Sequence, residues 1–143
     1  MAPKAIFYPM LAMVVLTAIV AVAMFRRRVT EMRTRRIHPQ KIALSAQMAS
    51  ALDDTRAADN FRNLFEAPVL FYAGVLAVYA TQLTSPAYVA LAWAFVATRL
   101  AHSTIQCTYN RVMHRLVAFA SGLFVLWTLY AVLAFDLLVA NRG

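Results

Sequence analysis

Four long apolar runs constrain this chain of 143 residues more than any other feature. They cover residues 6–25, 64–83, 86–105 and 116–139. Each holds roughly 20 residues, the length that an α-helix needs to cross the hydrocarbon core of a bilayer. Hydrophobic residues make up 62% of the chain and charged residues only 14%, an excess that a small soluble core cannot bury. We therefore predict an all-α integral membrane protein, a four-helix transmembrane bundle in a single domain over residues 1–143.

Basic residues gather on one side of the predicted membrane. Of the 14 Lys and Arg residues, nine lie between residues 26 and 63, and Arg111 and Arg115 lie in the loop before the fourth run. The positive-inside rule then puts both loops in the cytoplasm and both termini outside. These loops explain the formal charge of +8, so we expect a lipid bilayer and no nucleic acid as partner. The expected location is the inner membrane in a bacterium or the endoplasmic reticulum in a eukaryote.

The cytoplasmic segment 26–63 contains a stretch that favours a helix. Residues 41–62 hold no glycine or proline and are rich in Ala, Leu, Met and Gln, which are strong helix formers. We predict a helix from about residue 41 that continues into the second apolar run as one rod. Pro68 should kink this rod, because proline removes a backbone hydrogen bond.

Four ionisable residues lie inside the apolar runs, where each needs a partner or a cavity. At 1.5 Å per residue, Glu66 lies only about 3 Å inside the second run, while Arg99 and His102 lie about 20 and 24 Å along the third. Since these two runs enter from opposite sides, all three residues converge on the cytoplasmic leaflet. Asp136 stands apart, near the outer end of the fourth run, where we interpret it as interfacial.

Helical spacing adds further polar residues at the same depth, on one face of each helix and in the loop that follows. The set consists of Arg62, Asn63, Glu66, Arg99, His102, Gln106, Asn110, Arg111 and Arg115. Guanidinium groups bind carboxylates in pairs of hydrogen bonds, and one carboxylate can accept an ammonium group. This composition indicates a site for a small zwitterion with more carboxylates than amines. The site would open to the cytoplasm on one side and to lipid on the other.

The same residues also fit a purely structural role. Glu66 and Arg99 would form an ion pair between two helices, and His102 would bond to a neighbouring carbonyl. Convergence of many polar groups at one depth favours the ligand site, because structure alone needs one pair. The single cysteine, Cys107, excludes an intrachain disulfide and a multi-cysteine metal site, so we expect no metal.

Two motifs carry a family resemblance. The segment Arg62-Asn63-Leu64-Phe65-Glu66-Ala67-Pro68, followed by Arg99-Leu100-Ala101-His102, resembles the signature of the membrane-associated proteins in eicosanoid and glutathione metabolism, the MAPEG family. The resemblance extends over essentially the whole chain, including the basic end of the first helix at residues 26–28. It implies a four-helix bundle that forms a homotrimer, with glutathione bound between neighbouring subunits near the cytoplasmic side.

The resemblance also implies roles for individual residues. By position, the residues matching those that contact glutathione in the family are Arg62, Asn63, Glu66, Arg99, His102 and Arg115, joined by Arg27 or Arg28 from the first helix. In active members a polar group, often argued to be an arginine, holds the thiol as a thiolate, and Arg115 is our candidate for this catalytic role. The thiolate then attacks an electrophilic lipid or reduces a peroxide, so the expected function is that of a glutathione-dependent transferase or peroxidase.

Two departures from the family pattern leave other functions open. Gln106 stands where several active members carry a tyrosine, and Asp59 where some have an arginine. These changes fit a non-catalytic scaffold of the same fold that binds a lipid or a partner protein. A third possibility is a small transporter or proton relay that uses Glu66, Arg99 and His102, although a conduction path should also cross the outer, largely apolar half of the helices.

Overall fold

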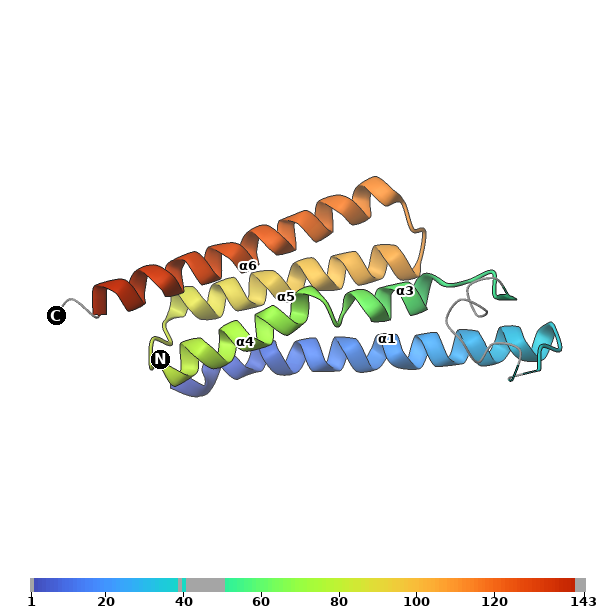
Figure 1. The fold of residues 1–143 in the computed structure, drawn as a ribbon, viewed down its shortest axis with the longest axis horizontal. Coiled ribbons are helices and arrows are strands. Elements are labelled where there is room, and N and C mark those ends of the chain that lie inside the picture. Colours follow the sequence, from blue (N-terminus) through green and yellow to red (C-terminus); the bar gives the residue numbers. More distant parts are fainter. Residues whose placement is uncertain (1, 39, 41–50, 141–143) are drawn as a thin grey trace.

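The computed structural model describes residues 2–38, 40 and 51–140, all of which are helical or lie in turns and loops. The helices form an elongated bundle in which α3 and α4 follow one another beside α1, and α5 and α6 run antiparallel to each other (Figure 1). Their bounds are Pro3–Ile6 for the 3-10 helix η1, Phe7–Thr34 for α1, Arg56–Asn63 for α3, Ala67–Ala80 for α4, Pro86–Cys107 for α5 and Val112–Ala140 for α6.

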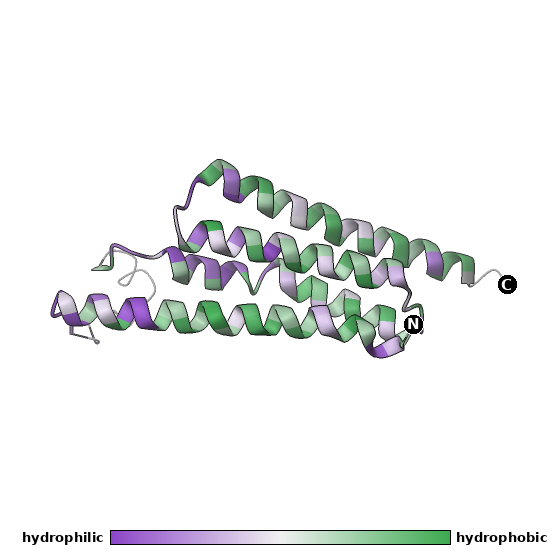
Figure 2. Cartoon of the chain, turned by 180° about the vertical axis from the view of Figure 1, so that it is seen from behind, coloured by the Kyte–Doolittle hydropathy of each residue, from purple (hydrophilic) through white to green (hydrophobic). Residues whose placement is uncertain are grey.

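Among the residues that the structure describes, three segments are long and apolar enough to cross a membrane: Pro3–Thr34, Arg56–Ala80 and Val112–Val139. Helix α5, with 22 residues, is long enough but lies outside this group, since its inner face carries polar side chains. Apolar residues dominate most of each long helix, and hydrophilic residues concentrate at the end that contains α3 (Figure 2). The all-helical fold class is therefore confirmed, and the chain is a multi-pass integral membrane protein.

The predicted rod from residue 41 into the second apolar run is wrong where the structure describes it. Residues 52–55 are not helical, and α3 begins only at Arg56. The chain turns again at residues 64–66, and Pro68 occupies the first turn of α4 rather than a kink within a helix. A continuing helix would press the proline ring against the carbonyl of Leu64, so a helix restart is favoured. Residues 41–50, where the prediction began, lie outside the described residues.

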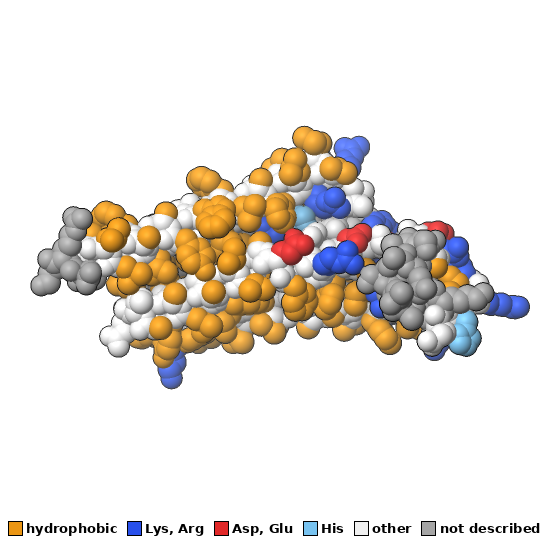
Figure 3. All heavy atoms as spheres, in the orientation of Figure 1, with side chains coloured by type: hydrophobic (Ala, Val, Ile, Leu, Met, Phe, Trp, Pro, Cys, Tyr) orange, Lys and Arg blue, Asp and Glu red, His pale blue; other side chains and the backbone are white. Residues whose placement is uncertain are grey.

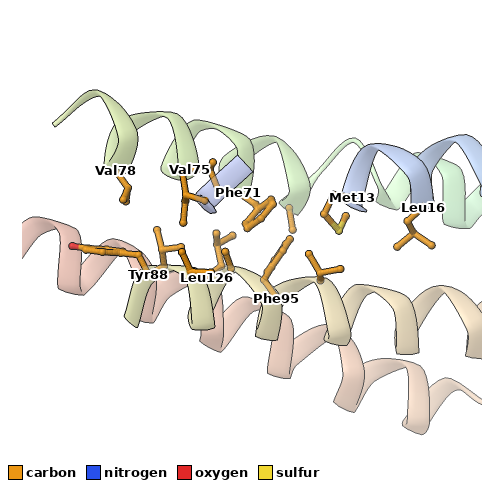
Figure 4. Close-up of a cluster of buried hydrophobic side chains, with 14 of the residues drawn as sticks. Met13, Leu16, Phe71, Val75, Val78, Tyr88, Phe95 and Leu126 are labelled. Carbon is orange, nitrogen blue, oxygen red and sulfur yellow. The ribbon is translucent and has the colours of Figure 1, made fainter. Parts of the chain in front are cut away.

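The apolar core lies where α1, α4, α5 and α6 meet (Figure 4). Phe71 of α4 and Phe95 of α5 stack with ring centroids 4.5 Å apart at an angle of 15°. Met13 of α1 and Leu126 of α6 belong to the same core and are fully buried. Because lipid is as apolar as this core, close packing rather than escape from water holds the faces together.

The end of the bundle remote from α3 has its own polar contact. Tyr88, fully buried near the start of α5, donates a hydrogen bond of 2.7 Å to Asp136 of α6. Asp136 is half-buried, and this hydrogen bond gives its carboxylate a partner on the neighbouring helix. This contact joins the first turns of α5 to the last turns of α6.

Candidate functional site

The polar stripe predicted on α5 faces the inside of the bundle. Arg99, His102 and Gln106 are each no more than 3% exposed, as is Ser103, which was not predicted. Their spacing of three or four residues keeps them on one side of the helix, toward α3 and α6. Ionisable and amide groups buried in this way need partners, and those partners define the site.

A chain of hydrogen bonds links three helices through this stripe. Asn63 Nδ2, at the end of α3, donates to Gln106 Oε1 over 3.1 Å. The same oxygen lies 2.8 Å from His102 Nε2, and His102 Nδ1 lies 3.2 Å from the backbone oxygen of Arg115 in α6. The network therefore fixes α3, α5 and the start of α6 relative to one another.

The partner of Nδ1 restricts the protonation of His102. A backbone carbonyl can only accept, so Nδ1 must carry a proton. If the ring is neutral, Nε2 accepts, so Gln106 must direct its NH₂ group toward His102. The Asn63 amide must then also be flipped, so that its oxygen faces Gln106. An imidazolium fits the amides as they stand. In either form both ring nitrogens are engaged within the protein, so His102 braces the helices, and a direct contact with a ligand stays a prediction.

A second pair of contacts lies one turn away and was missed from the sequence. Asn60 is fully buried; its Oδ1 accepts from Ser103 Oγ at 3.2 Å, and its Nδ2 donates to Cys107 Sγ at 3.4 Å. Asn60 precedes Asn63 by three residues, which places both amides on one face of α3. That spacing was the available signal in the sequence.

Arg99 points toward α6. Its Nη2 donates to the Phe119 backbone oxygen over 3.1 Å, and its guanidinium lies 4.8 Å from the Phe119 ring centroid and 5.2 Å from that of Phe95. Nε and Nη1 are buried without a hydrogen-bond partner among the described residues. The suggested Glu66–Arg99 ion pair is wrong in the described structure, since Glu66 is exposed at the break before α4.

The remaining predicted residues are accessible. Arg62, Glu66 and Arg111 are exposed, while Arg28 and Arg115 are half-buried. Arg115 Nη1 donates to Asn110 Oδ1 over 3.0 Å, which holds one edge of its guanidinium. Charged side chains gather on the half of the visible face around α3, and hydrophobic side chains cover the other half (Figure 3). The predicted set thus divides into buried residues that join the helices and charged residues that are accessible to solvent.

An ion cluster at the end of α5 was also not predicted. Asp54 accepts from Arg27 Nη1 at 3.2 Å and from Arg56 Nε at 2.8 Å. The two guanidiniums also donate to the backbone oxygens of Cys107 and Thr108, where a helix carries a partial negative charge. The Arg56 hydrogen bonds, with help from Arg27, lower the pKa of Asp54. Because Arg27 is engaged here, Arg28 is the freer of the two candidate arginines on α1.

Fold and site together define a small helical membrane protein with a buried polar network beneath accessible arginines at one end. The family model of MAPEG matches residues 6–135, from the start of α1 almost to the end of α6, so the chain belongs to the MAPEG family. No curated protein and no solved structure shows significant similarity to the chain.

Proposed function

We propose that this chain binds glutathione at its charged end and uses it as co-substrate in a transferase or peroxidase reaction on lipophilic electrophiles. Family membership supports the first half, since MAPEG proteins typically bind glutathione. The observation that carries the proposal is the hydrogen-bonded network from Asn63 through Gln106 and His102 to Arg115. It joins the two motif segments that carry the family resemblance to the start of α6.

The accessible charges suit this ligand chemically. Glutathione carries two carboxylates, one ammonium group and a thiol. Arg62 and Arg111 present exposed guanidiniums that can each bind a carboxylate through two hydrogen bonds. Glu66, exposed four residues after Arg62, offers the single negative charge that the ammonium group requires. The residues present therefore fit the ligand.

Arg115 is the best candidate to stabilise the thiolate. His102 contacts its backbone oxygen, and Asn110 accepts from one nitrogen of its guanidinium, so one edge of the side chain is held in place. It remains half-buried rather than enclosed. Bound glutathione supplies a sulfur nucleophile, and a guanidinium nearby lowers the pKa of a thiol because it stabilises the anion. Arg99, by contrast, is only 1% exposed and donates through Nη2 to the Phe119 backbone oxygen.

We further propose that the site is completed by a neighbouring subunit of a homotrimer, as the family resemblance implies. Arg62 and Glu66 are exposed in the single chain although both belong to the matching motif. A second surface laid over them would exclude water and strengthen their interactions with a charged ligand.

Calorimetry of glutathione binding to the detergent-solubilised protein tests the proposal. Glu66→Ala should weaken binding at least tenfold, since it removes a charge-assisted hydrogen bond. Asp53→Ala removes an equally accessible carboxylate, beside Arg35, and should leave the affinity unchanged. Equal effects of the two substitutions, or no binding by the wild type, would refute the assignment of the ligand site.

Ultraviolet absorbance of the bound thiolate at neutral pH tests the catalytic residue. The wild type should show the signal, and Arg115→Ala should lose it while still binding glutathione. An intact signal in this variant would remove Arg115 from the role.

A non-catalytic scaffold is the second candidate, and one observation favours it. Gln106, which replaces the tyrosine of several active members, has its side chain engaged by Asn63 and His102 and offers no hydroxyl group. Glutathione binding without turnover of any lipophilic electrophile would support this function over the enzymatic one.

A further inference from the structure

Helix α3 is short and has little apolar packing of its own. It is eight residues long and is bounded by non-helical segments at residues 52–55 and 64–66. Its buried residues are Ala57 and Asn60, and Ala57 contributes only a methyl group, while Phe61 is packed partly against the apolar core. The helix nevertheless lies against both α1 and α5 (Figure 1). Apolar contacts this small permit many rotations of a helix, so polar contacts must set the orientation of α3.

Asn60 supplies the most deeply buried of these polar contacts. Both ends of its amide bind α5, since Oδ1 accepts from Ser103 Oγ at 3.2 Å and Nδ2 donates to Cys107 Sγ at 3.4 Å. Ser103 and Cys107 are one turn apart, so a single amide connects to two successive turns of α5. A fully buried amide is costly to leave without partners, and a buried asparagine can fix the register of packed helices for this reason.

Asn63 attaches α3 to α5 at a second point. Its Nδ2 donates to Gln106 Oε1 over 3.1 Å. Gln106 directly precedes Cys107, which places the two side chains about 100° apart around α5. The two asparagines of α3 therefore hold neighbouring stripes of α5. A single contact would act as a pivot, whereas two contacts on different stripes define one rotation.

This rotation determines where Arg62 points. Arg62 follows Asn60 by two residues, which is about 200° around the helix. It is accordingly exposed, while Asn60 faces α5 and is buried. A rotation of α3 by the angle of one residue, about 100°, would carry the Arg62 guanidinium to another side of the helix. A carboxylate of glutathione bound by Arg62 would lose its partner.

We propose that Asn60 is a positioning residue of the glutathione site, because it locks the rotation of α3 and thereby presents Arg62 to a carboxylate of the ligand. Asn60 acts through Arg62 and does not itself bind the ligand. This role rests on the proposed function, since Arg62 contributes only when glutathione is bound.

Calorimetry of glutathione binding to detergent-solubilised Asn60→Leu tests this role. Leucine keeps the branched shape of the side chain but removes both hydrogen-bonding groups. The affinity should fall about tenfold, because the charge-assisted contact of Arg62 is lost. The matched control is Tyr88→Phe, which also removes a hydrogen bond of a fully buried side chain of the bundle, but at the end remote from α3. It should leave the affinity unchanged.

A second substitution separates positioning from a general structural effect. Arg62→Gln alone should also weaken binding about tenfold. If Asn60 acts through Arg62, the double variant Asn60→Leu/Arg62→Gln should lose about tenfold as well, since the two changes remove the same contact. A loss of about a hundredfold would mean that the two residues act independently and would overturn the positioning role.

Hydrogen exchange of the ligand-free protein supplies a readout that does not depend on glutathione. Exchange in α3 should be faster in Asn60→Leu than in the wild type, and equal rates would overturn the role. Wild-type glutathione affinity in this variant would also overturn it. Absence of glutathione binding by the wild type would instead refute the proposed function, and the exchange rates would still decide whether Asn60 fixes α3.

A milder variant covers the case in which Asn60→Leu loses its helical circular dichroism. Ser103→Ala removes one of the two hydrogen bonds of Asn60. Half of the free energy of a tenfold effect corresponds to a loss of affinity of about threefold. Unchanged affinity in Ser103→Ala would then refute the role of Asn60.

Discussion

Replacing Asp54 by asparagine should weaken the link between α1, α3 and the end of α5. The carboxylate accepts from Arg27 and from two nitrogens of Arg56. Those guanidiniums in turn hold the backbone oxygens of Cys107 and Thr108. Asparagine keeps the shape of the side chain but removes the charge that orients both arginines.

The magnitude follows from the exposure of the three side chains, which is 29% for Asp54, 34% for Arg27 and 41% for Arg56. Ion pairs this accessible to solvent contribute about 0.2–1 kcal/mol each, well below buried pairs. Loss of two such pairs should therefore lower the free energy of unfolding by about 0.4–2 kcal/mol at neutral pH.

The pH dependence gives the sharper test. The pKa of Asp54 is lowered in the folded state, first by its hydrogen bonds to Arg56. Its stabilisation is thus fully present above the unfolded pKa of about 3.9 and is lost as the pH falls through the lower folded value. Reversible unfolding in mixed micelles, followed by circular dichroism, should show a constant difference between wild type and Asp54→Asn from pH 7 to 5 that closes in stronger acid.

The matched control is Asp59→Asn. Asp59 lies in the same region and accepts a hydrogen bond from Thr55, but it takes no part in the ion cluster. This substitution should cost less than Asp54→Asn. An equal cost, or a difference for Asp54→Asn that persists unchanged to pH 3, would refute the reasoning.

Two further substitutions probe the helix interfaces by the same unfolding measurement. In Gly122→Ala the new Cβ would lie 2.5 Å from Arg99 Nη2. Overpacking should cost about 1–3 kcal/mol and the higher helix propensity of alanine should return about 1 kcal/mol, so we expect a net loss of stability of about 1 kcal/mol. A variant more stable than the wild type would contradict this expectation. Tyr88→Phe removes the hydrogen bond to Asp136 and should cost about 1.5 kcal/mol. Tyr130→Phe should cost less, because the Tyr130 hydroxyl donates to a neutral backbone oxygen. The reverse order would show that Asp136 does not act as a charged acceptor.

Much of the architecture could be predicted because lipid imposes simple rules. A run of roughly 20 apolar residues has few alternatives to a helix in a bilayer. The stripe of Arg99, His102 and Gln106 was equally readable, since polar groups on a membrane helix turn toward the protein interior. All three are buried as the spacing on α5 indicated.

Helix boundaries outside the apolar runs were less predictable. Residues 52–55 lie within the stretch that was predicted to be helical, yet they are not helical, and Asp54 binds Arg27 and Arg56 there. Asp and Thr are weaker helix formers than the Ala, Leu, Met and Gln that dominate the stretch, and these ion pairs are tertiary contacts that composition does not reveal. The partner of Arg99 was misjudged for a different reason: Glu66 lay at a suitable depth, but depth does not give direction around the bundle.

The sequence alone determined that the chain is a helical membrane protein of the MAPEG type and which side chains had to be withdrawn from lipid. These properties depend on periodicity and on the cost of exposing polar groups, both of which are local. Only the tertiary structure decided which group meets which, as when Arg99 reaches the Phe119 carbonyl and His102 that of Arg115. Such pairings depend on how the helices rotate and slide against one another, and that is set by packing among residues far apart in the chain.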